Sequence, residues 1–76
     1  MSKEEFILKL QETLEIEQSL NEDTVLASLD EWDSMTAMIL IGLVFEEFSV
    51  TLTSEDVEKL TTVGSVIEKI GLNKFV

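Results

Sequence analysis

Ser34 carries a hydroxyl group at the start of a predicted helix, directly after the short polar side chain of Asp33. Ser34 lies between Asp33 and Met35, directly before a run of mainly apolar residues. Asp and Ser are both preferred at helix N-termini, because their oxygen atoms accept hydrogen bonds from the unpaired N–H groups of the first turn. The three residues therefore predict a helix start, and they leave open whether the hydroxyl only caps the helix or is also modified.

The composition argues against catalysis by this serine. The chain contains no His and no Cys, and its basic side chains number five. The commonest general base, the commonest metal ligand and a reactive thiolate are therefore absent. A Ser hydroxyl without a base to activate it is a weak nucleophile. We expect no enzyme and no metal site.

The charge of the chain points to protein partners. Sixteen Asp and Glu residues against five Lys and Arg give a formal net charge of -11. Such a charge repels phosphate backbones and anionic lipids, and it attracts basic protein surfaces. We expect a monomer that binds no nucleic acid.

The sequence shows no membrane or export signal. The longest apolar run, Ala37 to Phe45, is shorter than the roughly 18 residues that indicate a membrane span. Residues 1–5 alternate in charge and lack the pattern of a secretory signal. We therefore expect the cytoplasm as the location.

Helical periodicity organises the chain into a single domain over residues 1–76. Ser2 and Glu5 form a capping-box pattern before a predicted helix over 3–15, in which apolar residues recur on one face. Residues 16–33 are rich in short polar side chains and predict a long loop. We expect apolar residues to hold this loop to the core: Leu20, Val25, Leu26 and Leu29.

Three further helices are predicted after the loop. The central one runs from Met35 to Phe48, with an inward stripe of Met38, Ile41, Phe45 and Phe48. Thr53 and Asp56 form a second capping box before a short helix over 54–60. Thr61 or Thr62 caps the last helix, whose core face is Val63, Val66, Ile67 and Ile70, with Gly71 at its end. The fold class is all-α, a bundle of three longer helices and one short helix.

This layout resembles that of acyl carrier proteins. In that family a long first loop leads to Asp-Ser-Leu at the head of the second helix, and Asp33-Ser34-Met35 matches this motif. The segment over 55–63, Glu-Asp-Val-Glu-Lys-Leu-Thr-Thr-Val, is similar to the short third helix of the family and the start of its fourth. The resemblance covers nearly the whole chain and implies a four-helix bundle of acyl-carrier type.

The resemblance implies a function for each residue of the motif. Ser34 would receive a 4′-phosphopantetheine arm from coenzyme A, Asp33 would help to hold the metal-bound coenzyme, and Met35 completes the motif. The position suits the attachment, because a phosphodiester at a helix N-terminus meets unpaired N–H groups and the positive end of the helix dipole. The implied partners are a phosphopantetheinyl transferase and the enzymes that load and transfer acyl groups.

The outward face of the central helix departs from the family pattern. Carriers of fatty acid synthesis usually place acidic residues on this face, whereas here it is largely uncharged. We interpret it as an apolar docking face for partners, and the alternative is that these side chains pack under the loop or line an acyl cavity. The candidate partner-binding residues are Thr36, Ile39, Leu43, Phe45, Glu46 and Glu47.

Several functions remain open within this resemblance. The cargo could belong to fatty acid synthesis or to specialised lipid, polysaccharide or secondary metabolite pathways. Trp32 before the motif is similar to carriers of specialised pathways, but we favour the interpretation that it only anchors the loop by burying its ring. Ser-Met in place of Ser-Leu is similar to D-alanyl carrier proteins. A protein-interaction domain without any modification is the alternative from a different class.

Overall fold

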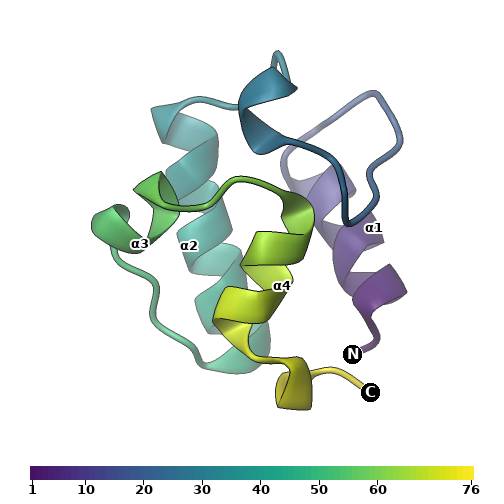
Figure 1. The fold of residues 1–76 in the computed structure, drawn as a ribbon, viewed down its shortest axis with the longest axis vertical. Coiled ribbons are helices and arrows are strands. Elements are labelled where there is room, and N and C mark those ends of the chain that lie inside the picture. The colour runs from purple at the N-terminus through teal and green to yellow at the C-terminus, as the bar shows by residue number, and fades with distance from the viewer.

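Four α-helices follow one another in this computed structural model, which describes residues 1–76. Helices α1, α2 and α4 lie around a common core, and the short α3 lies beside α2 on the side away from α1 (Figure 1). There is no β-strand, only an isolated antiparallel bridge between Val25 and Thr62. The prediction of an all-α bundle with one short helix is confirmed. The elements are α1 (Lys3–Thr13), α2 (Ser34–Phe48), α3 (Ser54–Glu58) and α4 (Val63–Ile70), with 3-10 turns at Leu26–Ser28 and Leu72–Lys74.

Each α-helix begins with a capping box, which explains why the helices start where they do. The N-cap residues are Ser2, Asp33, Thr53 and Thr62. In each box the N-cap side chain accepts a hydrogen bond from an N–H group that the first turn leaves unpaired, and the reciprocal bond is also present. Both predicted capping boxes are confirmed.

Two helices end two residues earlier than predicted. Helix α1 ends at Thr13 because Leu14 is its C-cap and Glu15 takes a positive φ of 55°. Helix α3 ends at Glu58. Gly71 after α4 has a positive φ of 113°, but its ψ of 125° lies outside the left-handed helical region that was predicted for this glycine.

The core consists entirely of apolar side chains. Sixteen residues are buried, and none is polar or charged. Three aromatic rings hold α1, α2 and the C-terminal tail together: Phe6 meets Phe48 and Phe75 edge-on at centroid distances of 5.6 and 5.7 Å. The predicted core face of α4 is buried in full.

The predicted inward stripe of α2 is wrong in two of its four residues. Met38 and Phe45 are 71% and 58% exposed, whereas Leu40, Leu43 and Val44 are buried. The reason is that α2 is apolar on almost every side, so its periodicity does not distinguish the core face from the outer face. The orientation follows from the packing of α1, α3 and α4 around it.

The long loop is held against α4 by backbone hydrogen bonds. Leu26 donates its N–H to the Thr61 carbonyl at 2.9 Å, and Gly64 donates to the Glu22 carbonyl at 2.8 Å. A Cβ at Gly64 would stand 3.0 Å from that same carbonyl oxygen, a tight contact that a larger residue could relieve only by moving the loop backbone slightly. This anchoring fixes the chain that leads into α2.

The apolar residues of the loop follow the prediction with one exception. Leu26 and Leu29 are buried and Leu20 is partly buried, but the Val25 side chain is exposed, and only the backbone of this residue pairs with Thr62. Trp32 packs partly buried against the core, as expected of a loop anchor. None of the four helices has the length and hydropathy needed to cross a bilayer.

Candidate functional site

Asp33 caps α2, and Ser34 is the first residue of the helix. The Thr36 N–H donates to the Asp33 carboxylate at 2.9 Å, and the Asp33 N–H donates to Thr36 Oγ1 at 2.8 Å. None of the hydrogen bonds at this helix start involves the Ser34 hydroxyl, which is exposed. Of the two residues that could cap the helix, Asp33 is the N-cap, and the Ser34 hydroxyl makes no capping hydrogen bond.

The capping bonds also set the acidity of Asp33. The hydrogen bond from the Thr36 N–H is the main reason why the pKa of this carboxyl lies below its usual range. The Thr36 hydroxyl and the Met35 N–H lower the pKa further by smaller amounts. A carboxylate with a lowered pKa stays ionised and is a weak base. Asp33 therefore suits contact with a cation better than acceptance of a proton from Ser34.

The surroundings of Ser34 fit an attached phosphate. Its hydroxyl is exposed at the N-terminus of a helix of fifteen residues. The first turn leaves backbone N–H groups without intrahelical acceptors, and the helix dipole is positive at this end. A phosphodiester on Ser34 would be stabilised there without displacing an existing hydrogen bond of the hydroxyl.

An apolar hollow lies beside Ser34, between α2 and α3. Its volume is about 270 Å³, and four of its seven lining residues are hydrophobic. Helix α2 contributes the floor next to the serine, and α3 contributes the opposite wall. The lining residues are Ser34, Ala37, Met38, Ile41, Ser54, Val57 and Glu58. The hollow is therefore able to receive an apolar group that is tethered to Ser34.

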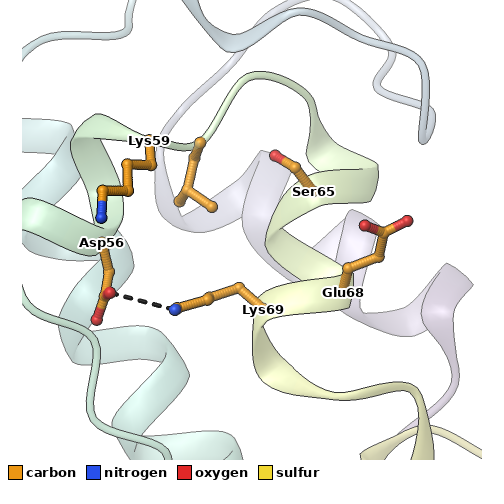
Figure 2. A pocket seen from close by; sticks show the side chains of 6 residues that line it. Asp56, Lys59, Ser65, Glu68 and Lys69 are labelled. Carbon is orange, nitrogen blue, oxygen red and sulfur yellow. Dashed lines mark ion pairs between the residues drawn. The ribbon is translucent and has the colours of Figure 1, made fainter.

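A second hollow, between α3 and α4, has a different character. Its volume is about 300 Å³, and Leu60 is its only hydrophobic lining residue. Figure 2 shows Lys69 extending from α4 toward Asp56 on α3, where the two side chains form an ion pair at 3.2 Å. This contact connects α3 to α4, and the charged lining is unsuited to an apolar group.

Exposed apolar side chains gather on the outer side of α2. Met35, Met38, Ile39 and Phe45 are 70%, 71%, 39% and 58% exposed, and they recur at three and four residues around Gly42. We name these five residues the α2 apolar face. It begins next to Ser34 and shares Met38 with the hollow.

The structure supports only some of the predicted partner-binding residues as surface groups. Ile39, Phe45 and Glu46 are exposed, but Leu43 is a core residue with 5% exposure, so its assignment to a docking face is wrong. Thr36 is engaged in the capping box, and Glu47 forms an ion pair with Lys9 of α1 at 3.8 Å.

Sequence reasoning missed the contributions of Met38 and α3. The apolar periodicity predicts Met38 in the core, although its spacing of three residues from Met35 and four from Gly42 places it on their side of the helix. The hollow could not be found in this way, because it depends on how α3 packs on α2. Nowhere in the structure do three or more potential metal ligands cluster.

Comparison with known proteins identifies a family for this chain. The family described as phosphopantetheine attachment site matches residues 5–70, which include the whole of α2, α3 and α4. No curated protein and no solved structure gives a significant match.

Proposed function

Because the chain belongs to the phosphopantetheine attachment site family, we propose that it carries acyl groups as thioesters on a 4′-phosphopantetheine arm attached to Ser34. The family carries this arm covalently, and its thiol supplies the thioester chemistry. The single observation that supports Ser34 as the attachment residue is its free, exposed hydroxyl at the start of α2.

The attachment needs no base from this chain. The bond from Ser34 Oγ to phosphorus forms as the phosphoanhydride bond of coenzyme A breaks, and the nucleotide leaves with the electron pair. The hydroxyl proton passes to a base of the transferase, since this chain has no His and Asp33 is a weak base. Asp33 would instead help to hold the metal-bound coenzyme, and the exposed Met35 would present an apolar side chain beside the arm.

The hollow between α2 and α3 would shield part of the cargo from water. Ala37, Ile41 and Val57 supply apolar walls within reach of a group tethered at Ser34. Burial of apolar carbon atoms is favourable by about 0.8 kcal/mol for each methylene. Apolar cargo would therefore rest in this hollow between visits to partner enzymes.

Partners dock on the α2 apolar face. Carrier domains act together with a phosphopantetheinyl transferase and with acyl-handling enzymes, and each must approach Ser34. The face lies on the helix that begins with Ser34, and Glu46 adds an acidic group at its far end. An apolar enzyme surface with a basic rim would complement it, whereas a net charge of -11 opposes a second copy of the chain.

The remaining parts of the proposal concern the whole protein. The chain is a single carrier domain over residues 1–76, without catalytic activity of its own, and it acts as a monomer in the cytoplasm. Its cargo belongs to fatty acid synthesis or to a dedicated lipid, polysaccharide or secondary metabolite pathway, with aminoacyl cargo as the alternative. One buried cluster of sixteen apolar residues supports a single folding unit.

Intact-mass analysis tests the attachment directly. The protein is incubated with coenzyme A, magnesium and a broad-specificity phosphopantetheinyl transferase, and one arm's mass should be gained. Ser34→Ala should gain none and should melt within a few degrees of the wild type, because Asp33 and not Ser34 caps α2. Ser54→Ala is a matched control that should still be modified, since Ser54 is an exposed first residue of α3. Wild-type protein that stays unmodified with several transferases would leave a plain interaction domain as the function.

A further inference from the structure

We propose that Glu58 makes the hollow beside Ser34 select cargo by charge, so that it shelters short acyl groups with neutral or cationic ends in preference to acyl groups that end in a carboxylate. The inference rests on the proposed function of Ser34. It goes beyond it by naming the residue that decides which cargo is sheltered.

Glu58 is the only charged residue in the lining of this hollow. The other lining residues are hydrophobic or carry a hydroxyl. Glu58 forms no ion pair, because the two ion pairs of the structure join Lys9 to Glu47 and Lys69 to Asp56. Its negative charge is therefore not neutralised by a side chain of the protein.

The nearby lysines lie on a different side of α3. Lys59 and Lys69 line the hollow between α3 and α4, where Lys69 is bound to Asp56 (Figure 2). Neither lysine lines the hollow beside Ser34. On loaded protein the phosphodiester on Ser34, which also lines the hollow, adds a second negative charge. A carboxylate at the end of the cargo would thus meet two negative charges and no positive one.

Apolar walls strengthen this discrimination. Charges interact more strongly next to a medium of low polarity than in water, and an ionised group loses hydration when it enters such a medium. A carboxylate in the hollow would lose hydration and be repelled by Glu58, whereas an ammonium group would be attracted. Because Glu58 is exposed, we expect a preference of about threefold, the size typical of exposed charge interactions.

The volume limits the length of the cargo. A cavity of about 150 Å³ lined by apolar side chains holds benzene, with its six carbon atoms. By proportion the hollow of about 270 Å³ holds roughly ten non-hydrogen atoms. Acyl chains of six or seven atoms fit this limit, and the flexible Met38 side chain on the wall can adjust to them.

Three cargoes of nearly equal length test the proposal. The transferase loads the protein with amide-linked coenzyme A analogues that carry heptanoyl, 6-aminohexanoyl or 5-carboxypentanoyl groups. The amide linkage prevents hydrolysis and cyclisation, and intact mass confirms loading. Backbone NMR shifts of Ala37, Ile41 and Val57, measured against protein with an unacylated arm, then report entry into the hollow.

We expect shifts at these residues for heptanoyl and 6-aminohexanoyl, and shifts about threefold smaller for 5-carboxypentanoyl. Glu58→Gln should raise the 5-carboxypentanoyl shifts toward those of heptanoyl, since it removes one of the two negative charges at the hollow. Glu55→Gln is the matched control, since it removes the same charge from an exposed residue of the same helix that does not line the hollow. It should leave the preference unchanged.

Failure of the two proposals would look different. Protein that gains no mass would overturn the attachment at Ser34. Loaded protein with equal shifts for all three cargoes, or with equal effects of Glu58→Gln and Glu55→Gln, would overturn charge selection by Glu58 and leave the attachment intact.

Discussion

At the start of α2, Asp33 caps the helix and is also proposed to help hold a metal ion, and a single substitution can separate these two roles. Asn caps a helix about as well as Asp does but cannot hold a metal ion by charge. Asp33→Asn should therefore fold normally and accept the arm about tenfold more slowly or worse, as expected for loss of a charge-assisted contact. Initial rates of modification measure this effect. Asp30→Asn, which removes an exposed charge from the loop, is the control, and an equal slowing there would assign the effect to overall charge.

The same carboxylate predicts a dependence of stability on pH. Hydrogen bonds from Thr36 lower the folded-state pKa of Asp33 below its ordinary value of 3.8. Its charge-dependent contribution is therefore fully present above the unfolded pKa and is lost as the pH falls through the folded value. The melting temperature of the wild type should exceed that of Asp33→Asn near neutral pH, and the two should converge well below pH 3.8. A constant difference down to the lowest pH would contradict this assignment.

The residue types at the start of α2 were sufficient to predict where the helix begins, but not which of Asp33 and Ser34 caps it. Asp33 and Ser34 are both good caps, and only the hydrogen bonds to Thr36 show that Asp33 fills this role. Partner-binding residues were harder to predict, since exposure depends on packing. Leu43 is buried and Met38 is exposed, although both are apolar residues of one helix.

Among the elements, α2 carries a glycine that the fold does not need. A Cβ on Gly42 would meet no atom within 4 Å, and the residue lies inside the helix. Gly42→Ala should stabilise the protein by about 0.8–1 kcal/mol, since Gly is less favourable than Ala in a helix interior by this amount. Denaturant unfolding measures the gain. A loss of stability would show that the glycine is required by the fold.

Salt dependence tests the docking role of the α2 apolar face. Phe45→Gln should weaken binding to a cognate acyl-handling enzyme by about tenfold or more, as loss of a large apolar anchor does. Added salt should weaken wild-type binding only modestly, because an apolar contact is not screened. Leu8→Gln is the control, since Leu8 is exposed to 61% but lies on α1. Equal losses for both variants would contradict docking on α2.

The predictability of each element follows from how amphipathic it is. Helix α4 has a clear apolar face, and all four residues predicted for its core are buried. Helix α2 is apolar nearly all round, so its bounds could be predicted closely but its rotation about its own axis could not. The hollow beside Ser34 depends on that rotation and on α3, which is why it emerges only from the structure.

For the whole molecule, the excess of negative charge opposes compaction. With a net charge of -11 and only two ion pairs, repulsion among the acidic side chains is largely uncompensated. Millimolar magnesium chloride and sodium chloride should both raise the melting temperature by screening this repulsion. Calorimetry across both titrations measures the effect. Since no cluster of three metal ligands exists, magnesium should act gradually rather than saturate at one equivalent, and no change with either salt would contradict uncompensated repulsion.

The two chain ends meet at the pole of the bundle opposite the start of α2 (Figure 1). The Val76 N–H donates to the Met1 carbonyl at 3.1 Å, so a short linker would join them without disturbing the core. Circular permutation with new ends among the exposed residues Glu17 to Ser19 should therefore preserve the bundle. In such a permuted chain the new N- and C-termini would lie in the loop between α1 and α2, where a fusion partner could be joined. The serine at the start of α2 would keep its surroundings.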